Sequence, residues 1–408
     1  MINVIEGGVT AAKGFMASGA EAGIKYKNRK DMALVYTKTP AICAGTFTTN
    51  VVKAAPVMWD MDIVKGNGMV HAVVLNSGVA NACTGKEGKE INEFFADETA
   101  KALGIKKEEV LTASTGVIGM QIPKEPVIKG VKLLKESLAD TIEAGTLAAE
   151  AIMTTDTVRK EAAVSYEMNG VTITVGGMAK GSGMIHPNMA TMLSVATTDA
   201  VIGKELLQKI TSKVVSESFN MISVDRDTST NDTFVVLANG EAGNEEIKEG
   251  TKECEAFEAA LSQVAVTLAK IMAADGEGAT KLFETKVTGA KTKEEATILA
   301  KSVITSNLVK TAVYGSDANW GRILCALGYS GVDFDPEIVD LTIVSEAGEL
   351  KLVENGKATD YSEEYATEIL SKSAVTAICD MKQGSEEATA WGCDLTYDYV
   401  KINGDYRS

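Results

Sequence analysis

Short apolar runs and alternating apolar and polar positions recur along the chain, and this pattern predicts β-strands. The predicted strands cover residues 32–36, 69–75, 162–166, 171–175, 233–237, 339–345 and 350–353. Asn169-Gly170 separates two of these strands, and Asn355-Gly356 follows the last one. Because Asn-Gly favours the tight turn of a β-hairpin, the strands on either side of Asn169-Gly170 are predicted to pair as a hairpin.

Other segments repeat apolar residues every three or four positions, which is typical of amphipathic helices. The predicted helices cover residues 89–103, 126–138, 146–153, 204–219, 253–273, 293–306 and 363–373. Helices and strands are interleaved, yet hairpins recur and no βαβ rhythm persists. We therefore expect an α/β (α+β) fold of layered mixed sheets with flanking helices, rather than a doubly wound parallel sheet.

Composition and charge restrict the class of protein. The 408 residues carry a formal net charge of −16 without any Lys/Arg-rich run, so nucleic acids and anionic membranes would be repelled. The six cysteines form no C-x-x-C motif and have no histidine at metal-ligand spacing, which favours a reducing compartment and no metal site. No secretory signal and no apolar stretch of about 20 residues is present. The expected location is the cytoplasm.

Candidate chemistry concentrates in residues 176–194, which are glycine-rich at first and then apolar and hydroxyl-rich. Lys180 precedes Gly181 instead of following it, so this segment is not a phosphate-binding P-loop. Only two histidines exist, which leaves little room for Ser-His-Asp chemistry. His71 opens an apolar strand and is expected to be structural, whereas His186 could be structural or assist a nearby step.

A threonine at a newly formed N-terminus is a nucleophile that needs no histidine. Its α-amino group, with an ordinary pKa of about 7.7–8.0, can take the proton of its own hydroxyl. Thr191 follows the small residue Ala190, and the glycines among residues 176–183 would permit the backbone distortion that attack on the preceding carbonyl requires. An ordinary strand threonine would fit the same local pattern, so this observation alone leaves both alternatives open.

The longer sequence pattern is far more specific. Residues 180–193 read KGSGMIHPNMATML and closely resemble the self-cleavage segment of the glutamate N-acetyltransferase/ornithine acetyltransferase family, also called arginine biosynthesis bifunctional protein ArgJ. Further segments resemble that family in the same order along the chain: NSGVANACTG at 76–85, STGVIG at 114–119, MTTDT at 153–157, DRDTSTND at 225–232, DGEGATK at 275–281 and GSDANWGR at 315–322.

The resemblance implies a reaction and a maturation step. The chain would cut itself between Ala190 and Thr191, giving an α fragment of residues 1–190 and a β fragment of residues 191–408. Thr191 would then carry acetyl from N2-acetyl-L-ornithine to L-glutamate. The chain would thus be a self-cleaving enzyme of the N-terminal-nucleophile type. No cofactor is implied, and the sequence leaves open whether acetyl-CoA is a second donor. The family also implies a heterotetramer of two α and two β fragments.

The resemblance assigns a role to each candidate residue. Thr115 and Gly116 would stabilise the oxyanion, with a hydroxyl and a backbone N–H. Substrate binding would fall to Thr154, Lys180, Thr191, Glu277, Asn403 and Ser408. Among these, Lys180 would hold a substrate carboxylate and Glu277 a substrate ammonium group. A lysine in a glycine-rich loop is otherwise usually solvated, and Glu277 would otherwise be a surface carboxylate between two glycines.

Two other interpretations remain open at this point. A self-cleaving N-terminal-nucleophile amidohydrolase would use water in place of glutamate as the acyl acceptor. A binding or scaffold protein would stay as one intact chain and would not depend on Thr191.

Overall fold

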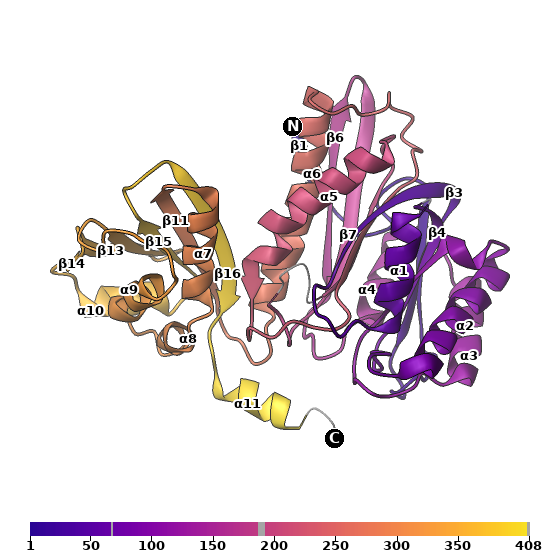
Figure 1. The fold of residues 1–408 in the computed structure, drawn as a ribbon, viewed down its shortest axis with the longest axis horizontal. Helices are drawn as coiled ribbons and strands as arrows, with labels where there is room; N and C mark the ends of the chain where they lie inside the picture. Colours follow the sequence, from indigo (N-terminus) through magenta and orange to yellow (C-terminus); the bar gives the residue numbers. More distant parts are fainter. Residues whose placement is uncertain (67, 187–191, 406–408) are drawn as a thin grey trace. The chain divides into compact units, whose positions relative to one another are not determined.

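The computed structural model describes residues 1–66, 68–186 and 192–405 (Figure 1). Two compact units are present. Unit 2 comprises Ser182–His186, Met221–Arg226 and the chain from Ala269 onward, and unit 1 is formed by the remaining described residues. This division is not the division between the two predicted fragments, because unit 1 contains chain from both sides of residue 190.

Within the described residues, unit 1 is built on a nine-stranded sheet of order β1-β6-β7-β8-β10-β3-β4-β5, with β2 paired to β3. Two pairs, β4–β5 and β8–β10, are parallel and the others are antiparallel. The strands are β1 (Ile2–Ile5), β2 (Phe15–Ala20), β3 (Met32–Phe47), β4 (Met69–Asn76), β5 (Val110–Ser114), β6 (Lys160–Met168), β7 (Val171–Lys180), β8 (Leu193–Thr198) and β10 (Thr233–Ala238). The predicted mixed sheet is therefore confirmed.

Helices cover both faces of this sheet. They are α1 (Ala55–Lys65), α2 (Gly85–Leu103), α3 (Lys124–Glu136), α4 (Ile142–Ala151) and α5 (Lys204–Glu217), with short 3-10 turns at Lys107–Glu109 and Phe219–Met221. Alternate strand residues point to opposite faces. Leu34 and Val74 accordingly join the core under α2 and α3, whereas Val35 and Val73 join the core that contains buried alanines of α4.

Helix α6 (Lys252–Ala274) begins in unit 1 and ends in unit 2. Within the described part of the chain it is the one helix long and apolar enough to cross a membrane by length and composition. Phe257, Leu261 and Val264 on this helix are buried, as in a core helix of a globular protein. One such helix is weak evidence for a membrane span.

Unit 2 contains a seven-stranded sheet, counted over the described residues, of order β14-β13-β12-β15-β11-β16-β9. The strands are β9 (Ile222–Ser223), β11 (Leu282–Ala290), β12 (Asp340–Ser345), β13 (Gly348–Glu354), β14 (Lys357–Ala358), β15 (Ala374–Asp380) and β16 (Glu386–Cys393). Its helices are α7 (Lys293–Ile304), α8 (Asn307–Tyr314), α9 (Trp320–Gly328), α10 (Glu363–Leu370) and α11 (Tyr397–Gly404). Helix α7 packs on β11 and β16, so this sheet too is covered by a helix.

Both Asn-Gly turns connect strands that pair. Asn169 and Gly170 have φ of 51° and 81°, and β6 and β7 pair from Met168–Val171 onward. Asn355 and Gly356 have φ of 47° and 72° and join β13 to β14. A left-handed φ at both central positions is what the tight hairpin turn requires, so the predicted hairpin between β6 and β7 is confirmed.

Strand β3 is longer than predicted. The apolar run at residues 32–36 ends at polar positions, yet the strand continues across Pro40 to Phe47 and pairs with both β4 and β10. Its register against β4 shifts between Tyr36 and Ala41. A proline is tolerated in a strand at such an irregularity, which local alternation does not reveal.

A cut between residues 190 and 191 would place β7 in one fragment and β8 and β10 in the other. We predict that the fragments stay together in native buffer, because β8 pairs along Val175–Lys180 of β7 and β10 pairs along β3. Size-exclusion chromatography should give one species in native buffer and two in denaturant. Separation without denaturant would contradict this prediction.

Candidate active site

The turn after β5 carries Thr115 and Gly116 in unit 1. The Thr115 N–H donates to the Asn76 carbonyl at 3.0 Å, and the Val117 N–H donates to the Gly78 carbonyl at 3.1 Å. Gly116 has a φ of 130°, and a Cβ added there would lie 2.2 Å from the Gly78 carbonyl carbon. Only glycine fits, because both the φ and the approach of the Gly78 backbone exclude a side chain.

Asn231 connects this turn to the segment at residues 76–85 by hydrogen bonds. Its side-chain amide donates to the Ala80 carbonyl at 2.6 Å and to the Ser114 carbonyl at 2.8 Å, and the Ser114 hydroxyl donates to Asn76 Oδ1 at 2.7 Å. Three of the segments that resemble the family thus meet in unit 1. Within the described chain, the Thr115 hydroxyl and the Gly116 N–H make no hydrogen bond, which suits donors aimed at an oxyanion.

Lys180 and Thr154, both predicted to bind substrate, lie next to each other in unit 1. Lys180 ends β7, and Thr154 follows α4. The Lys180 ammonium donates to Thr154 Oγ1 at 2.9 Å. Lys180 is only 7% exposed, so the alternative of a solvated loop lysine is wrong.

The glycines before Lys180 have a different role from the predicted one. Gly176 and Gly177 lie within β7, where a Cβ would meet the Gly8 carbonyl oxygen at 2.0 Å and a Val264 methyl group at 3.1 Å. They permit close packing of backbone and helix against the strand. The expectation that they permit backbone distortion is therefore wrong for these two positions.

Glu277 lies in a tight turn of unit 2 and is 6% exposed, so it is not a surface carboxylate. Its N–H donates to the Ser182 carbonyl at 3.0 Å, and its Oε2 accepts from the Asn403 amide of α11 at 2.7 Å. A Cβ on Gly183 would lie 2.2 Å from Oε2, so a side chain there would force the Glu277 carboxylate to move. The structure thus brings Glu277 and Asn403 together.

His186 and the two residues before it are held in unit 2 by residues 223–225. The Asp225 carboxylate accepts from the Met184 N–H at 2.6 Å and from the Ile185 N–H at 2.9 Å, and His186 Nδ1 lies 3.0 Å from Ser223 Oγ. Burial, with the nearby Lys301 and Arg226 charges, lowers the pKa of His186 to about 4. The imidazole is therefore neutral near pH 7, as a structural histidine would be.

The structure also shows a buried acid that the sequence had not singled out. Asp232 directly precedes β10 and is 1% exposed. Its carboxylate accepts a hydrogen bond from the Met192 N–H. Burial raises its pKa well above its ordinary value, although this and other hydrogen bonds oppose the rise. Its position within the 225–232 segment was the available signal, but burial could not be read from the sequence.

Three predicted residues, Ala190, Thr191 and Ser408, lie outside the described residues. His71 has the expected structural role, since its Nδ1 contacts the Thr37 carbonyl at 2.9 Å. The cysteines are free, and only Cys83 and Cys325 are exposed. Within the described chain, no group of three or more His, Cys, Asp or Glu residues could hold a metal ion.

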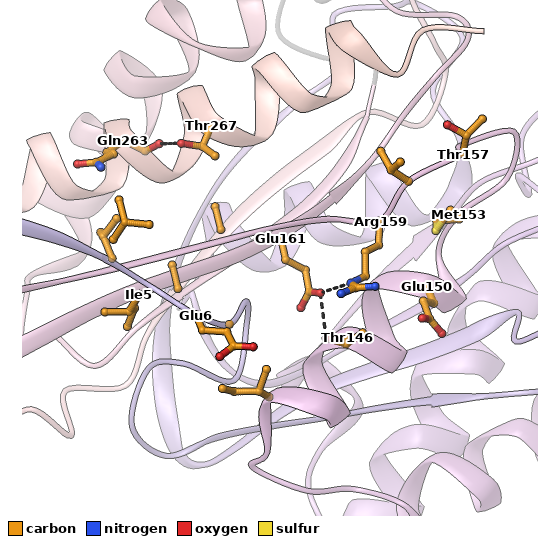
Figure 2. A pocket seen from close by; sticks show the side chains of 17 residues that line it. Ile5, Glu6, Thr146, Glu150, Met153, Thr157, Arg159, Glu161, Gln263 and Thr267 are labelled. Atoms are coloured by element: carbon orange, nitrogen blue, oxygen red, sulfur yellow. Dashed lines mark hydrogen bonds and ion pairs between the residues drawn. The ribbon is translucent and has the colours of Figure 1, made fainter. Parts of the chain in front are cut away.

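Unit 1 contains a cavity of about 860 Å³ (Figure 2). Figure 2 shows Glu161 beside Arg159, whose Nε lies 3.2 Å from Glu161 Oε2, and beside the Thr146 hydroxyl at 3.0 Å. Burial raises the pKa of Glu161. None of the predicted site residues that the structure describes lines this cavity. A smaller cavity of about 580 Å³ is lined by Thr154 and Asp156.

Comparison with known proteins decides the family. The model of the ArgJ family matches residues 16–408. The chain belongs to the ArgJ family. It is 52% identical over 407 residues to the arginine biosynthesis bifunctional protein ArgJ of Caldanaerobacter subterraneus subsp. tengcongensis, covering 100% of both chains. It is 44% identical to the ArgJ protein of Bacillus subtilis, over 99% of this chain and 97% of that one.

Solved ArgJ-family structures are also similar. The arginine biosynthesis bifunctional protein ArgJ of Bacillus halodurans matches 51% of this chain and 96% of its own, at 46% identity and a TM-score of 0.49. The ornithine acetyltransferase of Mycobacterium tuberculosis, solved in complex with ornithine, matches 47% of this chain and 100% of its own, at 40% identity and a TM-score of 0.44.

The lowered pKa of His186 predicts an acid-sensitive stability. Below its ordinary pKa of 6.5 the unfolded chain binds a proton that the folded chain excludes, so the free energy of unfolding falls as pH drops from 6.5 towards about 4. His186→Gln should lose part of this fall, and the difference in Tm between neutral and mildly acidic buffer should shrink. His71→Gln is the control and should retain the wild-type difference. Equal differences in all three proteins would contradict the prediction.

Proposed function

We propose that this ArgJ-family chain transfers acetyl from N2-acetyl-L-ornithine to L-glutamate, giving L-ornithine and N-acetylglutamate in arginine biosynthesis. The observation that carries the proposal is the family match, which extends over nearly the whole chain. Its curated relatives are named arginine biosynthesis bifunctional proteins. A buried lysine and a buried glutamate, Lys180 and Glu277, support it as partners for a carboxylate and an ammonium group.

Maturation precedes the transfer. The Thr191 hydroxyl attacks the Ala190 carbonyl, the peptide C–N bond breaks to leave an ester, and water hydrolyses the ester. The products are the α fragment 1–190 and the β fragment 191–408, whose first residue now has a free amine. That amine is the base for the hydroxyl of the same residue.

Acetyl transfer then takes two steps. The Thr191 hydroxyl attacks the acetyl carbonyl, its proton passes through the amine to the departing ornithine nitrogen, and an acetyl-threonine ester remains. The glutamate amine attacks this ester and releases the hydroxyl. Both tetrahedral intermediates carry an oxyanion, for which the Thr115 hydroxyl and the Gly116 N–H are the donors. Thr154, Asn403 and Ser408 complete the proposed substrate contacts.

The proposal extends to the assembly and the location of the protein. Two α and two β fragments form a heterotetramer, and the enzyme works in the cytoplasm without a cofactor. Family membership supports the assembly and the location, and the acyl-threonine chemistry supports the absence of a cofactor because it needs only protein groups and substrates.

The cut is tested by denaturing mass spectrometry. We expect two fragments that end at 190 and begin at 191 in the wild type, and one intact chain of 43.0 kDa in Thr191→Ala. Thr191→Ser keeps a hydroxyl and should still be cut, which makes it the matched control. An intact and fully active wild type would refute the mechanism, whereas an intact wild type without acetyl-transfer activity would favour a binding protein.

The acceptor distinguishes a transferase from an amidohydrolase. Ornithine release from acetylornithine should depend on added glutamate, with ping-pong kinetics, and N-acetylglutamate should form in equal amount. Acetate release at the same rate without glutamate would favour the amidohydrolase. A parallel assay with acetyl-CoA and glutamate, without acetylornithine, decides whether acetyl-CoA is a second donor.

A further inference from the structure

Asp156 is a buried carboxylate between two lysines of unit 1. Its side chain and that of Lys160 are both 0% exposed, and the Lys160 ammonium lies 2.7 Å from Asp156 Oδ1. The Lys180 ammonium lies farther away, 3.7 Å from Asp156 Oδ2, with its side chain 9% exposed. Two cations thus share one anion, and we call these three residues the lysine–aspartate cluster.

The Asp156 carboxylate also holds the backbone at Thr154 and directly after Lys180, the two residues proposed to contact the substrate in unit 1. Asp156 Oδ1 accepts from the Gly181 N–H at 2.6 Å, directly after Lys180, and Oδ2 accepts from the Thr154 N–H at 2.9 Å. One side chain therefore ties the segment after α4 to the end of β7. Both oxygens are used by donors, so the carboxylate has a defined place.

The cluster retains one positive charge. Burial raises the pKa of Asp156, but the charges of Lys180 and Lys160 outweigh it and hold the pKa well below its usual range, so the carboxylate stays ionised. Lys160 is the closer cation: its ammonium donates a hydrogen bond to Asp156 Oδ1 at 2.7 Å, whereas the Lys180 ammonium lies 3.7 Å from Oδ2. Asp232 also interacts with Lys180, but burial raises its pKa, which favours its neutral form. Among its described contacts, Lys180 donates a hydrogen bond to the Thr154 hydroxyl and makes only the longer ion pair with Asp156, so it is the cation of the cluster better placed to accept a second anion.

We propose that Lys160 is a positioning residue that acts through Asp156: by pairing with this carboxylate, it leaves the Lys180 charge available for the carboxylate of the substrate. This inference rests on the proposed function, in which Lys180 binds that carboxylate. Without the Lys160 ammonium, the Asp156 carboxylate would pair with Lys180. It would then compete with the substrate carboxylate for the Lys180 ammonium. Lys160 itself is fully buried and need not touch the substrate.

Lys160→Met tests the inference, because it keeps an unbranched side chain and removes only the charge. We expect KM for both acetylornithine and glutamate to rise about tenfold, with kcat changed less than about threefold. Asp156→Asn combined with Lys160→Met restores one net positive charge. Its KM should fall back by about threefold or more from the single variant.

Arg159→Met is the matched control. Arg159 is the neighbouring residue, its side chain is 56% exposed, and it pairs with Glu161 instead of Asp156. Loss of this positive charge should leave KM within about twofold of wild type. Lys160→Arg, which keeps the charge, should raise KM less than Lys160→Met.

Each variant is first checked for the 190/191 cut and for its Tm. If Lys160→Met fails to fold, Lys160→Gln against Lys160→Arg makes the same comparison. An unchanged KM in the folded neutral variant, or a double variant with no lower KM than the single one, would overturn the inference. Lys180→Met is the reference: if it raises KM and the wild type transfers acetyl, the proposed function stands whatever Lys160 does.

Discussion

The constraint on which the structure depends is the hydrogen-bonded ladder β7-β8-β10-β3 in the middle of unit 1. It joins strands from before and after residue 190 in one sheet, so the core belongs to neither proposed fragment alone. The predicted substrate lysine, Lys180, is the last residue of β7 and pairs with Leu193 of β8. The ladder therefore fixes the chain on both sides of the proposed cut.

Close approaches of backbone account for much of the glycine content around the candidate site. Gly116 meets the backbone of Gly78, and Gly176 meets that of Gly8. In each case a single methyl group would collide with atoms that cannot move without shifting a turn or a strand. These glycines are structural requirements of the site's frame, and they differ from the flexible loop that a run of glycines suggests.

Buried charge is the second theme of the structure. Lys180 and Glu277 are both buried. Lys180 is hydrogen-bonded to Thr154 in unit 1, and Glu277 is hydrogen-bonded to Asn403 in unit 2. Charges cost free energy when they leave water unless they are paired or hydrogen-bonded. In the lysine–aspartate cluster the Lys160–Asp156 pair offsets this cost, and the one excess cation suits the proposed role of Lys180 in binding a substrate carboxylate.

The sequence by itself determined the family, the mixed α/β class, the hairpin at Asn169-Gly170 and the site residues to consider, because motifs and turn chemistry are local. It could not show that β3 continues past Pro40 or that Lys180 and Glu277 are buried. Nor could it show that Asp156 and Asp232 are buried in unit 1, or that Asp225 accepts hydrogen bonds from the Met184 and Ile185 backbone in unit 2. Those features depend on which distant segments pack together. Only the tertiary structure decides them, because burial and charge pairing arise between residues that are far apart in the chain.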